Sequence, residues 1–261
     1  MPESLAQLFV ERVEKSHSKV ALRFKESRTP YRDMSWDDVD RMVREMAYGL
    51  ISLGFEPGAK AAVMAPTSYQ WAVSDFSIIL AGGVSIPIYP TSSSSDMEHI
   101  LNNSESQVVF VHNETLLNRI IAVRARIPHV KKLVLLTPPS KGRSLSELGF
   151  DDESKGLKDF VLGIEEFLEL GRKQQIEQPE LVDTRIKGIK RWDLATIIYT
   201  SGTTGTPKGV MLTHNNILSV LSDMPEVLPI GEEDTFLSFL PLSHVFERVA
   251  GEYYWVSSGA I

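Results

Sequence analysis

The residues with the clearest chemical potential form one short run late in the chain. Positions 199–216 read YTSGTTGTPKGVMLTHNN, with three glycines, five hydroxyl side chains and one lysine between 200 and 209. Glycines let backbone N–H groups turn toward an anion, hydroxyls add short donors, and Lys208 supplies a movable positive charge. The run therefore predicts a loop that binds a polyphosphate.

Other glycine-rich loops differ from this run. Exposed turns contain the same residue types, but not at this density. The GxxxxGK[ST] loop of nucleoside triphosphatases has a glycine before its lysine and a hydroxyl after it, whereas Lys208 lies between Pro207 and Gly209. The kinase glycine-rich loop has no such lysine. Pro207 stiffens the backbone before the lysine, which suits a flap over a phosphate chain.

A second candidate is the histidine of the run PLSHVFERVAGEY at 241–253. His244 follows an apolar run at 236–240 that predicts a strand, and it precedes a predicted helix. Open α/β sheets bind ligands where strands end and helices begin. A single histidine at a turn is more often a helix cap or a hydrogen-bonded core residue, so both roles are open. No second histidine or carboxylate lies at metal-ligand spacing, and we predict no metal site.

The residues after His244 have structural expectations. Glu247 and Arg248 are expected to form a structural pair or to supply charge at a helix end. Tyr253 and Tyr254 could line a tunnel, but we expect them to pack on the sheet.

Regular alternation upstream predicts the scaffold. Apolar runs at 61–65, 84–88, 108–111 and 133–136 begin 23, 24 and 25 residues apart, with helix-like stretches between them. This spacing fits right-handed βαβ units. The predicted fold class is α/β, with layered, mostly parallel sheets and helices on both faces. The run at 194–199 predicts a central strand directly before the phosphate run.

The remaining segments predict further elements. We expect helices at 4–17 and 36–52, the second capped by Ser35, and a strand pair at 20–24 and 30–35. A serine run at 92–95 predicts a helix start. Segment 151–191 holds ten acidic and eight basic residues and predicts a solvated insertion or a connector, with a helix at 163–175. His214 and Asn215 are predicted to cap a helix at 216–227.

Composition limits the class of protein. The 261 residues are 43% hydrophobic and 23% charged, which excludes a disordered tail, a collagen-like rod and a coiled coil. A net charge of -7 argues against nucleic acid as a partner. Without cysteine there is no disulfide, thiolate zinc site or cysteine nucleophile.

No segment has the pattern of a membrane span. The most apolar run, 76–89, is broken by two glycines and a proline, so we predict no transmembrane segment. The N-terminal 19 residues contain three glutamates, so they lack the pattern of a secretory signal. We expect a cytoplasmic protein, with peripheral association at the inner membrane left open because no amphipathic basic helix supports it.

The run TSGTTGTPKGV resembles the signature motif of the adenylate-forming (AMP-binding) superfamily, which includes acyl-CoA synthetases, luciferases and peptide-synthetase adenylation domains. It matches the ten-residue core of that motif throughout. The resemblance implies that the hydroxyls and the lysine contact the β and γ phosphates of ATP, while the glycines give access. The residues assigned in this way are Thr200, Ser201, Gly202, Thr203, Thr204, Gly205 and Lys208.

The version PLSHVFERV is similar to long-chain fatty acyl-CoA synthetases more than to amino-acid-activating domains or acetyl-CoA synthetases. In that family the residue at the position of His244 meets the substrate carboxylate, which implies a catalytic role for His244. The implied reaction converts a long-chain fatty acid and ATP, with Mg²⁺, to an acyl-adenylate and then to acyl-coenzyme A. Two alternatives are a fatty acyl-AMP ligase that feeds a carrier protein and a non-catalytic nucleotide-binding module.

Later motifs of the resembled family do not occur in the chain: the magnesium-holding glutamate, the ribose-binding aspartate, and the C-terminal domain with its catalytic lysine. We therefore expect 1–261 to be a partial N-terminal domain. In this scheme 1–150 is the βαβ region, 151–191 the charged connector or insertion, and 192–261 the part with both motifs. Such a chain should make no acyl-coenzyme A alone and should self-associate through exposed faces.

Overall fold

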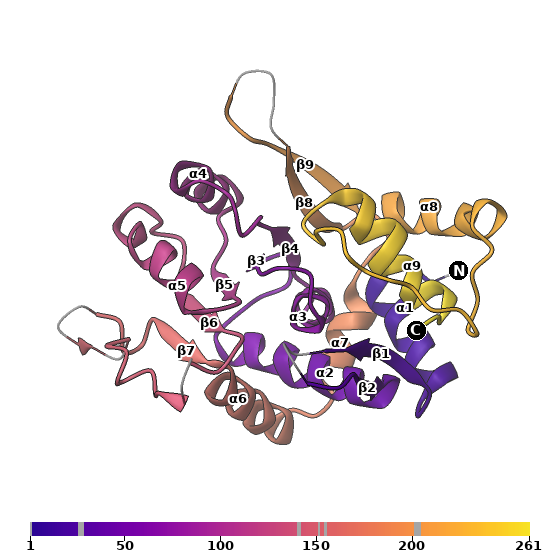
Figure 1. Cartoon of the computed structure of the whole chain (residues 1–261), viewed down its shortest axis with the longest axis horizontal. Helices are drawn as coiled ribbons and strands as arrows, with labels where there is room; N and C mark the ends of the chain where they lie inside the picture. Colours follow the sequence, from indigo (N-terminus) through magenta and orange to yellow (C-terminus); the bar gives the residue numbers. More distant parts are fainter. Residues whose placement is uncertain (1, 26–28, 140–141, 151, 154–155, 201–204) are drawn as a thin grey trace.

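The computed structural model describes residues 2–25, 29–139, 142–150, 152–153, 156–200 and 205–261. Within these ranges the strands form a seven-stranded sheet of order β7-β6-β5-β3-β4-β8-β9 and a separate pair, β1-β2 (Figure 1). Neighbours in the larger sheet are parallel except β8 and β9. The predicted α/β class with a mostly parallel sheet is confirmed.

The larger sheet contains β3 (Lys60–Met64), β4 (Val84–Pro87), β5 (Val108–Val111), β6 (Lys132–Leu135), β7 (Val161–Gly163), β8 (Leu194–Thr200) and β9 (Lys208–Thr213), and the pair consists of β1 (Val20–Phe24) and β2 (Arg32–Ser35). The helices are α1 (Leu5–Ser16), α2 (Trp36–Ser52), α3 (Tyr69–Leu80), α4 (Ser94–Ser104), α5 (Glu114–Ile121), the short 3-10 helix η1 (Arg124–Arg126), α6 (Ile164–Glu177), α7 (Leu181–Gly188), α8 (His214–Val227), the π-helix η4 (Glu247–Tyr253) and α9 (Tyr254–Ser258).

The four evenly spaced strands form the centre of the sheet. The chain passes from β3 to β4 through α3, then crosses to β5 on the other side of β3. Successive side chains of a strand point to opposite faces. Ala61 and Val63 of β3 accordingly join the core under α2, α3 and α6, while Ala62 and Met64 join the core under α4 and α5. The predicted helices on both faces are therefore present.

The first helices follow their sequence signals closely. The side chain of Ser35 accepts a hydrogen bond from the Asp38 backbone N–H, and the Asp38 carboxylate accepts one from the Ser35 N–H. This capping box satisfies two backbone donors that a helix start leaves unpaired. Helix α2 consequently begins at the predicted residue. The predicted pair of strands is also present as β1 and β2, which are antiparallel.

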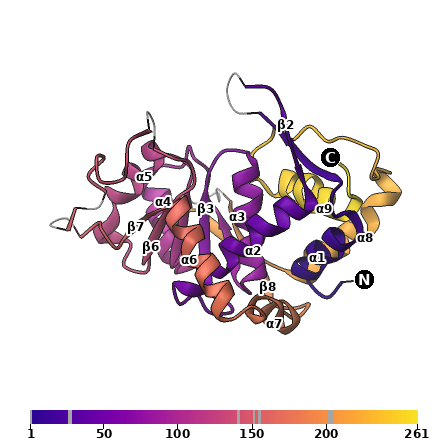
Figure 2. The ribbon, with the colours of Figure 1, turned by 90° about the horizontal axis from the view of Figure 1, so that it is seen from below.

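The charged segment 151–191 is part of the main sheet. Its strand β7 pairs in parallel with β6, and its helix α6 lies beside α2 (Figure 2). A Cβ added at Gly171 of α6 would lie 2.0 Å from the carbonyl oxygen of Glu45 in α2, so the two backbones touch. The segment thus adds a strand to the sheet, and its described charged side chains lie mainly on the outer surface.

The predicted strand at 236–240 is wrong. No described strand pairs with this segment, although the Phe236 N–H bonds to the Ile261 carbonyl at 2.7 Å. Leu237 and Phe239 are 81% and 72% exposed. An apolar run becomes a strand only where a neighbour takes up its backbone groups, and here the segment stays a loop.

None of the described helices is long and apolar enough to cross a membrane.

Candidate nucleotide-binding site

The described parts of the phosphate run lie at the carboxyl edge of the sheet, where β8 and β9 form a hairpin (Figure 1). β8 ends at Thr200, and β9 returns antiparallel from Lys208, which pairs with Thr200. The sequence did not lead us to predict β9. Because β8 is parallel to β4, the hairpin connection begins where the carboxyl ends of parallel strands meet. Open α/β sheets bind their ligands at this edge.

Three of the seven predicted phosphate-binding residues are described, and all three lie in this hairpin. Lys208 and Thr200 are exposed, and the Lys208 ammonium makes no hydrogen bond or ion pair with any residue that the structure describes. Gly205 has φ +85°, a left-handed conformation that glycine adopts without strain. The other predicted residues, Ser201, Gly202, Thr203 and Thr204, lie outside the described residues.

Gly209 has a packing role that the sequence did not reveal. It pairs with Tyr199 across the hairpin, and an added Cβ would lie 2.7 Å from Ile197 Cγ2 and 3.1 Å from Tyr199 Cζ. A side chain at this position would displace the Tyr199 ring. The glycine after the lysine therefore leaves room for the side chains of Ile197 and Tyr199.

The segment before His244 is fixed to the same sheet edge. The Thr67 hydroxyl, just beyond β3, accepts a hydrogen bond from the Leu242 backbone N–H at 3.2 Å. The Ser243 hydroxyl donates to the carbonyl of Ile88, just beyond β4, at 3.3 Å. Both predicted motifs thus lie at the carboxyl ends of β3, β4 and β8.

His244 itself is exposed. Its Nδ1 accepts a hydrogen bond from the Phe246 N–H at 3.2 Å, so in the neutral ring the proton is on Nε2. The local bond matches the cap role that the sequence left open, and the ring is not a core residue. Nε2 remains available to donate to a carboxylate. In the described residues His244 has no hydrogen bond to the hairpin.

Arg248 lies in the core and does not pair with Glu247, whereas Glu247 lies in the first turn of η4, which matches the alternative expectation of charge at a helix end. The Arg248 guanidinium is 0% exposed, donates to the Asp75 carboxylate of α3, and donates to Thr196 Oγ1 of β8 at 2.5 Å. The Tyr253 hydroxyl donates to the second Asp75 oxygen at 2.8 Å. Glu247 instead accepts from the Ser238 hydroxyl.

The sequence held a signal for this cluster. Asp75 is the only charged residue in α3, and a carboxylate in an apolar helix requires a buried partner. Burial alone would lower the pKa of Arg248, but the charge of Asp75 raises it above its ordinary value. Burial raises the pKa of Tyr253 far above its usual value, so its hydroxyl stays protonated.

The two tyrosines that follow His244 are buried as expected, but their contacts are with α3 and the end of α8 rather than with the sheet. Tyr253 is 0% exposed and meets the Phe76 ring edge-on at 5.8 Å between ring centres. Tyr254 is also buried and donates to the Leu228 carbonyl. Neither tyrosine lines a tunnel. Glu252 is buried with neither carboxylate oxygen hydrogen-bonded, and burial raises its pKa well above the ordinary value, which favours the neutral acid.

A pocket lies at the opposite edge of the sheet, near the amino ends of β3, β4 and β8. Lys60, Leu194 and His214 contribute to its lining. His214 was predicted to be a helix cap together with Asn215, but the cap of α8 is Thr213, whose hydroxyl accepts from the Asn216 N–H. No predicted site residue lines this pocket, so we place the candidate site at the carboxyl edge.

The described residues contain no group of three or more His, Cys, Asp or Glu side chains that could hold a metal ion. They do not by themselves form a Mg²⁺ site, and we derive no step through that ion.

Comparison with known proteins fits this geometry. The model of the AMP-binding enzyme family matches residues 9–261. The long-chain-fatty-acid–CoA ligase ACSBG2 of Xenopus laevis is 31% identical over 248 residues, which cover 94% of this chain and 31% of the relative. The chloroplastic long-chain-fatty-acid–[acyl-carrier-protein] ligase AEE15 of Arabidopsis thaliana is 32% identical over 237 residues, covering 88% and 31%. The chain thus spans about a third of the length of these curated relatives.

A solved structure extends the comparison to the fold. The fatty acyl-adenylate ligase of L. pneumophila, solved with acyl adenylate and pyrophosphate, superposes with a TM-score of 0.70 at 20% identity. The match covers 99% of this chain and 38% of that one. Because the family model matches residues 9–261, which is nearly the whole of this chain, the chain belongs to the family of AMP-binding enzymes.

Proposed function

We propose that the β8–β9 hairpin binds the β and γ phosphates of ATP. The supporting observation is the pairing of Thr200 with Lys208 at the carboxyl edge of the sheet, which leaves an exposed ammonium without a partner among the described residues. ATP carries several negative charges, and a nearby cation offsets them. Ser201, Gly202, Thr203 and Thr204 are included on the strength of the sequence motif.

Calorimetric titration of the purified chain with Mg·ATP tests this proposal. A charge-assisted hydrogen bond contributes roughly 1.5–3 kcal/mol, so Lys208→Ala should raise the dissociation constant roughly 10- to 100-fold. Lys173→Ala is the matched control, because Lys173 is an exposed lysine on α6, away from the hairpin. Unchanged affinity in Lys208→Ala, or no binding by the wild type, would contradict the proposal.

At the full length of its relatives, we propose, such a protein activates a long-chain fatty acid. A carboxylate oxygen attacks the α phosphorus of ATP, pyrophosphate leaves, and an acyl-adenylate forms. The thiol of coenzyme A then attacks the acyl carbon, AMP leaves, and the thiol proton passes to solvent. Lys208 would stabilise the departing pyrophosphate, and the Nε2–H of His244 would bind the carboxylate. For His244→Ala we expect a raised KM for the fatty acid, and an unchanged KM would remove His244 from the site.

The acyl acceptor has a second candidate, because AEE15 is named as a ligase to acyl-carrier protein. Mass spectrometry of the products that the full-length protein makes from palmitate, ATP and Mg²⁺, with and without coenzyme A, separates the two. Acyl-coenzyme A indicates the first candidate, and acyl-adenylate alone indicates transfer to a carrier protein. Binding of ATP by the full-length protein without any product would indicate a non-catalytic module. We expect the present chain alone to form no acyl-coenzyme A.

Location and self-association are also proposals. We expect a cytoplasmic protein, with peripheral membrane association tested by flotation on vesicles. Large apolar side chains are exposed near the C-terminal loop and α8, and contiguous apolar surface promotes association. A monodisperse monomer in light scattering would contradict self-association. The most exposed of these side chains are Met211 (64%), Val227 (82%), Leu237 (81%), Phe239 (72%) and Phe246 (61%).

A further inference from the structure

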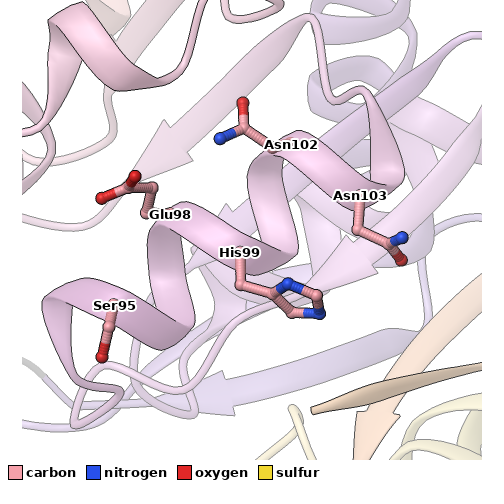
Figure 3. A pocket seen from close by; sticks show the side chains of 5 residues that line it. All are labelled: Ser95, Glu98, His99, Asn102 and Asn103. Atoms are coloured by element: carbon pink, nitrogen blue, oxygen red, sulfur yellow. The ribbon is translucent and has the colours of Figure 1, made fainter. Parts of the chain in front are cut away.

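Helix α4 contacts both strand ends of the phosphate hairpin. His99 Nε2 lies 2.9 Å from the carbonyl oxygen of Pro207, the residue before Lys208. The Tyr199 hydroxyl, one residue before Thr200, donates to Asn103 Oδ1 at 2.7 Å. His99 and Asn103 are one helical turn apart, and both point from α4 toward the hairpin (Figure 3).

The bond from His99 has a defined direction. A carbonyl oxygen only accepts, so Nε2 carries the proton, whether the ring is neutral or charged. This bond fixes the peptide group that joins Pro207 to Lys208. The proline ring restricts the backbone on one side of that group, and the pairing of Lys208 with Thr200 restricts it on the other. The backbone of Lys208 is thereby held in place, so its side chain leaves the sheet in one defined direction.

The contact from Tyr199 fixes the opposite strand. Its ring is nearly buried and stands at 90° to the His99 ring, with 6.3 Å between ring centres. Gly209 leaves space for this ring, as described above. The imidazole, the phenol and the Asn103 amide thus form one cluster between α4 and the hairpin. The face of α4 that carries His99 and Asn103 can therefore pack on the hairpin although it is polar, because both side chains have hydrogen-bond partners there.

We propose that His99 and Asn103 are positioning residues that hold the two strand ends of the phosphate hairpin, and with them Lys208, in the geometry that binds ATP. This inference rests on the proposed function. Neither residue belongs to the phosphate motif, and both act through the backbone and side chains of the hairpin.

Two isosteric variants of His99 separate positioning from general packing. The Nε2 of a glutamine can occupy nearly the place of the histidine Nε2, so His99→Gln keeps the donor to Pro207. The amide of an asparagine reaches only to the place of Nδ1, so His99→Asn loses that donor. Glu98→Gln is the matched control, because Glu98 lies next to His99 on α4 but pairs with Arg126 at 2.7 Å.

Two measurements on the purified chain give the outcome. In calorimetry His99→Asn should bind Mg·ATP ~3- to 10-fold more weakly than wild type, while His99→Gln and Glu98→Gln stay within about twofold. In hydrogen exchange without nucleotide, the Lys208 and Gly209 amides should exchange ~3- to 10-fold faster in His99→Asn alone. Equal melting temperatures would show that the fold is intact.

The results distinguish this inference from the proposed function. If wild type binds no ATP but the amides of His99→Asn exchange faster, the contact holds the hairpin and the proposed function fails. If wild type binds ATP and His99→Asn matches it in affinity and exchange, the positioning role is refuted. Equal loss in His99→Gln and His99→Asn would also refute it, because the donor would then be irrelevant.

Discussion

Removing the guanidinium of Arg248 should destabilise the chain more than any exposed charge change. The group joins η4 to α3 and β8, and both Arg248 and Asp75 are 0% exposed. Arg248→Met keeps most of the side-chain volume but deletes the donors to Asp75 and Thr196. Among the described residues, the Asp75 carboxylate then retains only the Tyr253 hydroxyl as a hydrogen-bond partner.

The magnitude follows from the unpaired charge. Removing one partner of a buried ion pair costs roughly 3–5 kcal/mol, because the remaining charge is stranded in the interior. Native proteins are stable by roughly 5–15 kcal/mol, so Arg248→Met should remove a large fraction of the stability. Urea unfolding followed by far-ultraviolet circular dichroism measures the change in the free energy of unfolding.

A double-mutant cycle with Asp75→Asn tests the mechanism. The double variant strands no charge, so it should be destabilised by less than the sum of the single variants, with a coupling energy of roughly 1–3 kcal/mol. Arg23→Met is the control, since Arg23 pairs with Asp33 on the surface and its loss should leave no measurable change. Additive single effects would show that Arg248 and Asp75 are not coupled.

Two further variants test burial and close packing by urea unfolding. Burial lowers the pKa of His214 to about 4 from 6.5. Between these pH values the unfolded chain therefore binds a proton at His214 that the folded chain does not. The free energy of unfolding falls by about 3 kcal/mol as the pH falls from 6.5 toward 4. His214→Asn keeps an acceptor for the Leu5 N–H. Between pH 7 and pH 4 this variant should lose about 3 kcal/mol less stability than the wild type; parallel pH profiles of the two proteins would contradict this. Gly171→Ala should cost roughly 1–3 kcal/mol because its Cβ would meet the Glu45 carbonyl, whereas Gly188→Ala, with no atom within 4 Å, should be tolerated; equal effects would contradict the close approach of α2 and α6.

Sequence patterns predicted the elements whose signals are local. Ser35 as a capping residue defined the start of α2, and the even spacing of apolar runs defined β3 to β6. These elements depend on periodicity and capping, which a short window contains. The hydroxyl and glycine content of the phosphate run predicted a loop after the strand at 194–199 but not the returning strand β9, which makes the connection a hairpin.

Elements that depend on distant partners were missed or mistaken. β9 is exposed at the sheet edge and became a strand because β8 pairs with it, while the run at 236–240 stayed a loop because no described strand does. Capping of α8 by Thr213 depends on where β9 ends, which moved the helix start two residues upstream of the predicted helix. Strand identity is thus decided by pairing as much as by the residues themselves.

The buried guanidinium of Arg248 connects the two segments that carry the sequence motifs, the phosphate hairpin and the run around His244. Thr196 lies four residues before Thr200 on β8, and Arg248 lies four residues after His244. The bond between Arg248 and Thr196 therefore connects the strand that leads to the phosphate hairpin with the helix that begins beside His244. Thr196 also donates to the Ser85 carbonyl of β4, so three elements meet at one hydroxyl. Reaction between two bound groups requires their separation to be controlled to within about an ångström, and a fully buried, hydrogen-bonded cation provides that control better than a surface pair does.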